Sequence, residues 1–375
     1  MDARLQQALA RLNQPQADMD YRPGHERVCA LLAELHVGEP MLRIRVAGTN
    51  GKGSTSHMLS NGLITSGKRI GLYTSPHIIH FNERIRINGN PVSDATLLDA
   101  LDVILPLAER IGTSPFETST ALALYIFEQH KVDVQIIEAG VGARLDTSTA
   151  VAADMALITP IGLDHQAWLG DNLTAIAREK AHIMDGCRWA LTGEDTQTGA
   201  VLSTLQQHHP VQLVARDTSL ACAMAGQHQQ DNASLALAAI ACLEQHHVLQ
   251  THQARAAVTT TVVAGRMQPV AYGAATLWLD AAHNMHAIEA LLPWLAARPK
   301  PFEAILLCPR EDRDLSSAVP LLSPYTRHMV YQQVALHEHK NHVQKTVESV
   351  VNHNVSSDYL LLGSFQTIAA VLSTS

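Results

Sequence analysis

Hydrophobic and polar positions along this chain follow two alternating patterns. Short, nearly continuous apolar runs predict strands at residues 44–47, 70–74, 132–139, 156–159, 276–280, 304–308, 328–331 and 359–362. Between them, apolar residues recur at helical spacing, which predicts helices over residues 3–12, 25–36, 56–66, 93–110, 117–130, 172–184, 232–246 and 287–297. Strands that alternate with helices in this way predict an α/β fold with a doubly wound, mainly parallel sheet.

The remaining segments show no clear period. We expect a turn at residues 21–24, a polar loop at residues 81–89, and short strand-like runs separated by polar turns over residues 188–225. Gly265-Arg266 precedes the predicted strand at residues 276–280, which begins a new series of strands and helices, so we place a domain boundary there. The expected domains are residues 1–265 and a smaller, Rossmann-like α/β domain over residues 266–375.

Composition narrows the classes of function. The chain has 375 residues, of which 46% are hydrophobic and 17% charged, and a net charge of −8. This length suits two domains with separate cores, and so acidic a chain is a poor ligand for nucleic acid. The five cysteines form no C-x-x-C pair, charges interrupt the first thirty positions, and no apolar run is long enough to span a bilayer. We therefore expect a cytoplasmic protein that binds neither membranes nor nucleic acid.

The segment after the first predicted strand, Gly48-Thr49-Asn50-Gly51-Lys52-Gly53-Ser54, has the layout of a phosphate-binding loop. Glycines let backbone N–H groups converge on an anion, and the start of a helix adds its positive dipole end. In such a loop Lys52 would reach the terminal phosphates and Ser54 would hold Mg²⁺. The strict pattern has Gly and a hydroxyl residue where this chain has Val46 and Gly53. Because glycine turns also precede helices for packing alone, the loop by itself leaves nucleotide binding open.

Polar residues lie at or beyond the ends of three other predicted strands, and these are Ser75, Glu138 and His165. The carboxyl ends of parallel strands share one edge of a sheet, so we expect these side chains to gather near the glycine-rich loop, where ligands bind in this architecture. By residue type alone, a His beside an Asp is more often structural than a ligand. By the same reasoning Lys180 is an exposed helix lysine that pairs with Glu179 or Glu83.

A set of motifs runs in order along nearly the whole chain. They are Val46-Ala47-Gly48-Thr49-Asn50-Gly51-Lys52-Gly53-Ser54-Thr55, Tyr73-Thr74-Ser75-Pro76-His77, Phe81-Asn82-Glu83-Arg84-Ile85, Arg144-Leu145-Asp146, Ile161-Gly162-Leu163-Asp164-His165, Ala177-Arg178-Glu179-Lys180-Ala181, Gly226-x-His228-Gln229-x-x-Asn232-Ala233, Gly265-Arg266, Leu279-Asp280-x-Ala282-His283-Asn284 and Gly363-Ser364. Together they resemble the folate branch of the Mur ligase family, the dihydrofolate synthase/folylpolyglutamate synthases.

This resemblance implies a fold, a reaction and a set of ligands. The fold would be a P-loop-containing sheet like the Mur ligase central domain, followed by the smaller domain. The reaction would be ATP-dependent amide formation, in which L-glutamate is joined to dihydropteroate, and further to folates, through an acyl phosphate. ATP and two Mg²⁺ ions would be the cofactors, small molecules the only partners, and the enzyme a monomer.

The resemblance also assigns roles to residues. Catalytic positions would be Lys52, His165 and Lys180. ATP would be bound by Asn50, Gly51, Lys52, Gly53, Ser54, Asn232, Arg266, Asp280 and His283. Ligands to the metal ions would be Ser54, Ser75, Glu138, His165 and, when carbamylated, Lys180. The pocket for the acceptor carboxylate would be formed by Phe116, Glu117, Leu145, Asp146 and Thr147.

The chain departs from the family pattern near the acceptor. Thr147 stands where the family typically has Ala, Pro160 replaces an Asn, and residues 308–314 only loosely match the glutamate-side region. Three hypotheses therefore stay open: a folate ligase, the same chemistry on another aryl or heterocyclic carboxylate, and a catalytically silent ATP-binding module. The joint presence of Lys52, Ser54, Glu138, His165 and Lys180 argues against the silent module.

Histidine is plentiful, with 21 residues. His337-x-His339-x-x-His342, His208-His209 and His246-His247 have spacings that could bind a transition metal. Without cysteines or a surrounding apolar frame, we expect solvated polar loops at these positions.

Overall fold

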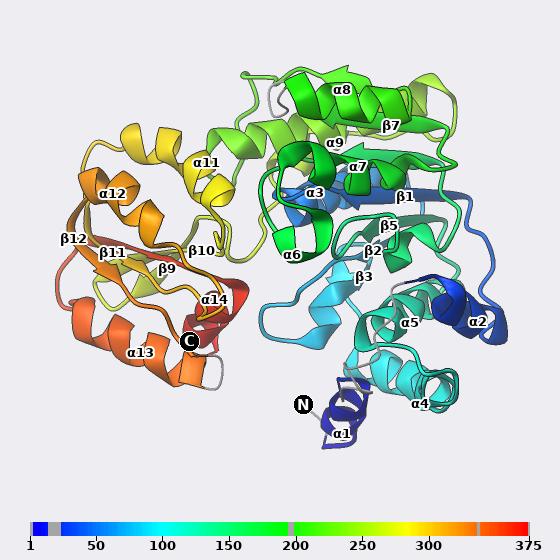
Figure 1. The fold of residues 1–375 in the computed structure, drawn as a ribbon, viewed down its shortest axis with the longest axis horizontal. Helices are drawn as coiled ribbons and strands as arrows, with labels where there is room; N and C mark the ends of the chain where they lie inside the picture. The colour runs from blue at the N-terminus through cyan, green and yellow to red at the C-terminus, as the bar shows by residue number, and fades with distance from the viewer. Residues whose placement is uncertain (1–2, 14–23, 194–198, 336–337, 374–375) are drawn as a thin grey trace. The chain divides into compact units, whose positions relative to one another are not determined.

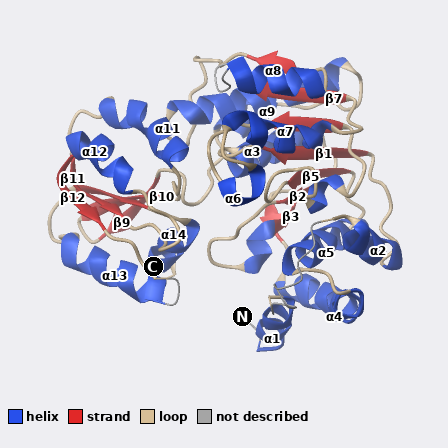
Figure 2. Cartoon of the chain, viewed as in Figure 1, coloured by secondary structure: helices blue, strands red, loops and turns tan. Residues whose placement is uncertain are grey.

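The computed structural model describes residues 3–13, 24–193, 199–335 and 338–373. The chain forms two compact units, each with strands and covering helices of its own (Figure 2). The first comprises Met1–Ser75, Phe81–Asp217 and Asp231–Thr259, and the second comprises Pro76–His80, Thr218–Gln230 and Thr260–Ser375. The second unit thus takes in two short segments that precede the boundary expected at Gly265.

The first unit is built on an eight-stranded sheet with the order β4-β3-β2-β5-β1-β6-β7-β8. Its strands are β1 (Leu42–Ala47), β2 (Ile70–Tyr73), β3 (Ile85–Ile87), β4 (Asn90–Pro91), β5 (Val134–Glu138), β6 (Met155–Ile158), β7 (Trp189–Gly193) and β8 (Gln212–Val214). The strands from β2 to β8 in this order are parallel, whereas β3 and β4 extend the edge in antiparallel fashion. In the register, Val46 of β1 pairs with both Glu138 and Leu157, so three strands end level with one another.

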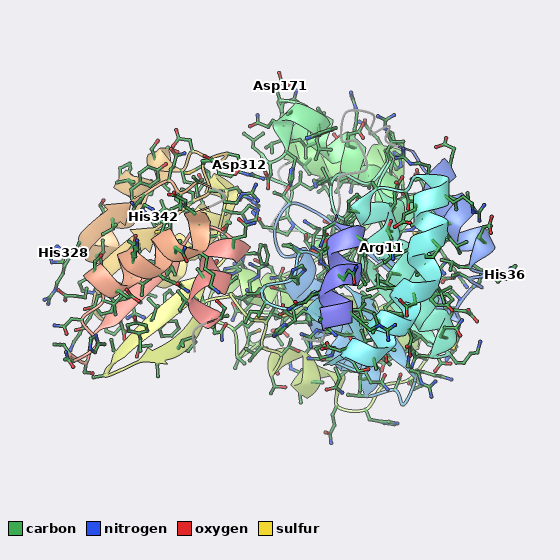
Figure 3. All side chains as sticks on the ribbon, turned by 90° about the horizontal axis from the view of Figure 1, so that it is seen from below. Arg11, His36, Asp171, Asp312, His328 and His342 are labelled. Carbon is green, nitrogen blue, oxygen red and sulfur yellow. The ribbon has the colours of Figure 1, made fainter. Side chains whose placement is uncertain are left out.

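Helices cover both faces of this sheet (Figure 1). They are α1 (Ala3–Leu12), α2 (Glu26–Glu34), α3 (Lys52–Ile64), α4 (Asp94–Ile111), α5 (Pro115–Gln129), α6 (Gln166–Leu169), α7 (Leu173–Ala181), α8 (Gly199–His208), α9 (Gln227–Gln245) and α10 (Ala254–Thr259). Apolar residues of α7 and α8 pack on Ala156 and Ile158 of β6 in one core cluster. The helices α1, α2, α4 and α5 share another cluster, beside which Arg11 pairs with Glu109 at 2.7 Å (Figure 3).

The second unit has a five-stranded sheet with the order β12-β11-β13-β10-β9. Its strands are β9 (Gln268–Tyr272), β10 (Ala275–Asp280), β11 (Phe302–Leu307), β12 (Thr326–Tyr331) and β13 (Asp358–Leu362), and only β9 is antiparallel to its neighbour. Its helices are α11 (Met285–Ala296), α12 (Val319–Leu322), α13 (His339–Val350) and α14 (Phe365–Leu372). Residues of α11 and α12 join one core cluster and residues of α13 and α14 another, so each face of the sheet is covered. The predicted fold class is confirmed in both units.

Each strand predicted from an apolar run is present, but three other expectations were wrong. The loop expected at residues 81–89 contains β3, where Ile85 is buried and pairs β2 across the sheet edge. Within residues 188–225 the chain forms α8, in which Val201, Thr204 and Leu205 are buried at helical spacing. The helix expected from Ser56 begins at Lys52. Of the turn expected at residues 21–24, only Gly24 lies within the described residues.

None of the helices in the described residues is long and apolar enough to cross a membrane.

Candidate functional site

The glycine-rich loop joins the end of β1 to the start of α3. Its glycines Gly48 and Gly51 have φ angles of 145° and 89°, in the region that favours glycine. A Cβ at Gly48 would lie 1.9 Å from Thr159 Oγ1, and one at Gly51 would lie 2.5 Å from Asn232 Oδ1. Because α3 begins directly at Lys52, the amides of its first turn belong to this loop and have no carbonyl partner within the helix. This is the backbone arrangement that binds anions at helix N-termini.

The loop is held by the segment that follows β6. The backbone N–H of Thr49 donates to the carbonyl of Pro160 at 2.8 Å, and that of Asn50 donates to the same carbonyl at 3.4 Å. The Thr49 hydroxyl donates to the carbonyl of Gly162 and accepts from its N–H, both at 3.0 Å. Pro160 lacks a backbone donor, but the loop uses only its carbonyl oxygen. The departure from the family at this position therefore leaves the support of the loop intact.

Two lysines converge on one carbonyl oxygen of the loop. Lys52 Nζ donates to the carbonyls of Gly48 at 3.3 Å and Thr49 at 3.1 Å. Lys180 Nζ, from α7, donates to the same Gly48 carbonyl at 2.8 Å. Residues distant in sequence thus place two amines at the turn that would receive phosphate.

Lys180 is buried, with only 3% of its surface exposed. Desolvation, together with the positive charge of Lys52, lowers the pKa of Lys180 from its ordinary value to about 7, although Asp164 and Asp146 act in the opposite direction. Glu179 pairs instead with Arg144, at 3.1 Å. The view of Lys180 as an exposed lysine paired with Glu179 or Glu83 was therefore wrong.

Oxygen ligands of the kind that Mg²⁺ prefers lie beside the start of α3. Glu138 ends β5, is 4% exposed, and accepts a hydrogen bond from the backbone N–H of Ser75 at 3.1 Å. Ser54 is buried in the first turn of α3. The carboxylate of Glu138 lies 3.6 Å from the point where a Cβ of Gly53 would be, so the absence of a side chain at Gly53 opens the space between them. This donor set fits a hard divalent cation, and the individual ligands stay a prediction.

His165 follows β6 and has a left-handed backbone conformation, with φ of 51°. Its N–H donates to Asp164 Oδ1 at 2.8 Å, and its Nε2 lies 3.9 Å from Asp164 Oδ2. Asp164 is buried, whereas about a third of the His165 side chain is exposed. The buried carboxylate therefore fixes the backbone of His165 and lies near its accessible imidazole. Asp164 was not among the predicted site residues, although an acid directly before this His was visible in the sequence.

Asn232 of α9 lies against the same loop. Its buried Oδ1 accepts a hydrogen bond from the Thr55 hydroxyl at 3.2 Å, and it faces Gly51 closely enough to exclude any side chain there. A contact from Asn232 to a bound nucleotide stays a prediction that this position supports.

Asp146 organises the loop that carries the predicted acceptor residues. Its Oδ2 accepts hydrogen bonds from the N–H groups of Gly140 at 3.0 Å and Val141 at 3.1 Å, and its Oδ1 accepts one from Ser148 at 2.9 Å. Burial raises the pKa of the Asp146 carboxyl, and the hydrogen bonds from Ser148, Val141 and Gly140 oppose that rise. The carboxylate therefore shapes the loop, while the neighbouring Leu145 is 39% exposed.

Phe116 and Thr147 are both linked to Tyr73, Phe116 directly and Thr147 through Thr120. The Phe116 ring fills the space that a Cβ of Gly140 would need, and its centroid is 6.5 Å from that of Tyr73. The Thr147 hydroxyl is hydrogen-bonded to the Thr120 hydroxyl at 2.7 Å, and Thr120 lies 3.5 Å from the Tyr73 hydroxyl. Neither Thr120 nor Tyr73 was predicted to lie at the acceptor pocket, because nothing in their local pattern marks which face of a helix or strand meets this loop.

Glu117, the remaining predicted pocket residue, is buried and engaged on both sides. It forms a capping box with Ser114 at the start of α5 and an ion pair with Arg27 at 3.1 Å. Its carboxylate is thus used in fixing the helix that carries Phe116.

In the second unit, three predicted residues gather at the end of β10. Asp280 accepts hydrogen bonds from the N–H groups of Met267 and Ala282, both at 2.9 Å. Burial raises the pKa of the Asp280 carboxyl, and the charges of Arg266 and His228 oppose that rise. Arg266 and His283 both lie against the ring of Phe365, at 4.8 Å and 6.1 Å from its centroid. Phe365 was missed, although it follows the Gly363-Ser364 motif directly.

The other histidine motifs are dispersed. His339 Nε2 is hydrogen-bonded to Thr367 at 2.9 Å, whereas His342 is hydrogen-bonded to Gln332. Figure 3 shows His342 on α13 and His328 on β12. His337 lies outside the described residues, and His246 packs against the ring of Trp189. His208 lies with His182 and Asp185 instead of with His209.

Comparison with known proteins gives consistent matches. The Mur ligase middle domain family matches residues 46–215. The dihydrofolate synthase/folylpolyglutamate synthase of Escherichia coli (strain K12) is 33% identical over 295 residues, which cover 74% of this chain and 69% of that protein. The enzyme of the same description from Bacillus subtilis (strain 168) is 31% identical over 316 residues, covering 74% of this chain and 73% of that protein.

Solved structures match over the full length. E. coli FolC in complex with DHPP and ADP superposes with a TM-score of 0.82 at 26% identity, covering 99% of this chain and 97% of that one. A bifunctional folylpolyglutamate synthase/dihydrofolate synthase from Yersinia pestis, complexed with AMPPNP and Mn ion, superposes with a TM-score of 0.81 at 27% identity, covering 99% and 97%.

Proposed function

Since this chain belongs to the Mur ligase family, in its dihydrofolate synthase/folylpolyglutamate synthase branch, we propose that it joins L-glutamate to dihydropteroate and to folates at the expense of ATP. The observation that carries the proposal is the convergence of Lys52 and Lys180 on the Gly48 carbonyl, beside the buried carboxylate of Glu138. Such a site concentrates positive charge and metal-binding oxygens where a phosphate loop begins a helix.

The reaction fits this arrangement of charge. An oxygen of the acceptor carboxylate attacks the γ-phosphorus of ATP, ADP leaves, and an acyl phosphate results. The glutamate amine then attacks the acyl carbon, phosphate leaves, and the amine loses a proton as the amide forms. Negative charge develops around the transferred phosphoryl group in the first step and on the acyl oxygen in the second. The amides of the first turn of α3 and the ammonium of Lys52 are the groups that we assign to stabilising it.

The predicted metal ligands fit one cation beside the phosphate loop and a second near the acceptor. We assign Ser54 and Ser75 to the first, and Glu138 and His165 to the second. Bound Mg²⁺ would supply charge neutralisation on the phosphoryl oxygens. His165, whose backbone is held by Asp164, is the one nitrogen ligand in a set otherwise made of oxygens, which hard cations favour.

Lys180 is assigned to the second metal as a carbamate. A pKa of about 7 leaves a large share of its amine neutral near neutral pH, and only a neutral amine can add to CO₂. The product is a carboxylate-like anion that replaces a buried cation. The charges of Asp164 and Asp146 act on the Lys180 ammonium. A carbamate at the same position would lie near these two carboxylates and would therefore need a cation to neutralise it.

On the acceptor side, we assign direct contact to Phe116, Leu145 and Thr147. Asp146 and Glu117 hold the loop and the helix that present them, because their carboxylates are used by backbone N–H groups and by Arg27. In the second unit, we assign Arg266, Asp280 and His283 to nucleotide binding. The ring of Phe365 packs against the Arg266 guanidinium and the His283 imidazole and so supports both side chains.

The test is a phosphate-release assay with purified protein. ATP with Mg²⁺, glutamate and dihydropteroate together should release phosphate, and omission of any one should stop it. A failure of every pteroate and folate to stimulate release, with release by another aryl carboxylate, would overturn the substrate and keep the ligase chemistry. ATP binding without any turnover would indicate a silent binding module.

We further propose that the enzyme acts as a monomer in the cytoplasm. All five cysteines are free, and Cys29 is exposed, as suits a reducing compartment. Light scattering of the protein as it elutes from a size-exclusion column should give the mass of one chain, both with and without ATP.

A further inference from the structure

A cluster of three metal-ligating side chains lies outside the residues assigned to ATP, metal and acceptor. His182 begins the short helical turn η4 (His182–Met184) that follows α7, Asp185 ends that turn, and His208 is the last residue of α8. All three belong to the first unit. Their ligand atoms lie within 4.8 Å of one another.

The carboxylate of Asp185 bridges the two imidazoles. His182 Nδ1 is 2.8 Å from Asp185 Oδ2, and His208 Nε2 is 2.7 Å from Asp185 Oδ1. The two rings meet edge to face, with their centroids 4.6 Å apart. Both nitrogens therefore face the same carboxylate, one at each of its oxygens, which brings the three side chains close enough to share an ion.

The backbone beneath the cluster is fixed by buried groups. Arg45 of the central strand β1, which is 3% exposed, donates through Nη1 to the carbonyls of Ile183 at 3.2 Å and Asp185 at 3.0 Å. Ile183 is fully buried, and α8 contributes Val201 and Leu205 to the same core cluster. Both ends of the cluster are thus attached to a rigid core, so the three ligands need only side-chain rotation to close on an ion.

We propose that His182, Asp185 and His208 form a binding site for a divalent transition-metal ion, with Zn²⁺ as the best-suited member of that class. Two imidazole nitrogens and one carboxylate oxygen are a ligand set that suits Zn²⁺ and its neighbours in the first transition row, and they disfavour Mg²⁺, which takes oxygen ligands. The side chains of His182, Asp185 and His208 are 31%, 55% and 26% exposed, so an ion can reach them and solvent can complete its coordination.

Binding would replace hydrogen bonds with coordination bonds. On neutral histidines, the proton now facing Asp185 moves to the other ring nitrogen, and the freed lone pair binds the ion. No oxidation or group transfer is involved. The ion would join the C-terminal end of α7 to that of α8, two helices that cover the same face of the sheet. The site therefore adds a cross-link within the first unit, independent of the ligase reaction proposed above.

The experiment is calorimetric titration of the full-length protein with Zn²⁺ in the presence of millimolar Mg²⁺, which occupies oxygen-rich sites. Wild type should bind one equivalent tightly. His182→Ala and His208→Ala should each weaken that binding by more than about 100-fold, since even the loss of an outer partner of a ligand reduces affinity by 10- to 100-fold. His209→Ala is the matched control, because His209 is adjacent in sequence but is hydrogen-bonded to the carbonyls of Pro210 and Cys187.

His208→Gln keeps a donor for Asp185 without an imidazole, so it separates ligation from loss of the local hydrogen bond. It should fold with wild-type circular dichroism and still lose the site. Zn²⁺ should also raise the melting temperature of wild type and His209→Ala, but not of His208→Gln, because an ion that binds only the folded state stabilises it. Unchanged Zn²⁺ affinity in His182→Ala and His208→Gln would overturn the proposal, as would an equal loss in His209→Ala.

Discussion

Replacing Lys180 by methionine should stabilise the first unit at neutral pH, because a buried amine is removed. The Lys180 side chain is 3% exposed, and burial lowers its pKa from 10.5 to about 7. Methionine has similar length and no charge to desolvate. The hydrogen bond to Gly48 is lost, which costs about 1 kcal/mol, but that carbonyl keeps Lys52 as a donor at 3.3 Å.

The pH dependence of this effect has a definite sign. A lysine whose pKa is lower in the folded protein than in the unfolded chain holds its proton less well when folded, so stability rises with pH between the two values. Below pH 7 the whole penalty is present, on the order of 5 kcal/mol for the gap between 10.5 and about 7. From there it shrinks by about 1.4 kcal/mol per pH unit and vanishes above the unfolded pKa.

The measurement is urea unfolding of wild type and Lys180→Met at intervals from pH 6 to pH 9.5, in buffers freed of CO₂. The free-energy difference between them should be largest and constant below pH 7 and should fall steadily above it. A control series with Lys68→Met, an exposed lysine, should show no such trend. Addition of bicarbonate should flatten the wild-type curve, since carbamylation removes the titrating amine.

A difference that stays constant from pH 6 to pH 9.5 in CO₂-free buffer would refute the reasoning. It would mean that Lys180 keeps its proton in the folded protein throughout this range. A flat curve that bicarbonate leaves unchanged, together with an unmodified mass, would also remove the carbamate from the proposed metal site.

Three further predictions concern the loop and the acceptor side. Lys52→Ala should lower kcat/KM by about 100-fold or more, as loss of one charge-stabilising donor does, while the melting temperature stays within a few degrees; a wild-type rate would show that the phosphate loop is misread. Thr147→Ala should remove the hydrogen bond to Thr120, cost about 1 kcal/mol in unfolding free energy and shift KM for the acceptor with little change in KM for ATP; equal shifts for both would place Thr147 outside the acceptor pocket. Asp146→Ala should leave three backbone N–H groups without their acceptor, one of them buried, and destabilise the first unit by about 1–3 kcal/mol in urea unfolding, whereas Asp171→Ala, at an exposed position, should have no measurable effect.

Several strand ends could be predicted from the sequence because those strands are short, mainly apolar runs with a polar residue or a glycine-rich loop at the end. The run before Glu138 gave the end of β5 correctly, and the edge shared by Glu138 and the phosphate loop followed from parallel pairing. The start of α3 was placed too late, since Gly51 and Gly53 look like a turn, whereas Gly51 with positive φ is the N-cap and Gly53 is already helical.

The burial of individual side chains and the contacts between residues far apart in sequence could not be predicted in the same way. Lys180 has a charged neighbour on its helix, which is typical of an exposed face, and only the approach of α7 to the loop buries it against Gly48. His182 and Asp185 are three residues apart, but His208 ends the next helix, and no spacing rule joins the end of one helix to the end of the next. The strand β3 is three residues long, too short for its alternation to stand out from a polar loop.

The shared Gly48 carbonyl has a thermodynamic consequence for the unmodified enzyme. The charge of Lys52 helps to lower the pKa of Lys180, so an anion that binds at the loop and neutralises Lys52 raises that pKa again. Nucleotide binding is then accompanied by proton uptake, and reciprocity requires the affinity for nucleotide to increase as the pH falls toward the pKa of Lys180. Carbamylation abolishes this coupling, because the modified side chain takes up no proton. At a given pH, the proton uptake from Lys180 that accompanies nucleotide binding therefore scales with the fraction of molecules that carry a free amine at this position.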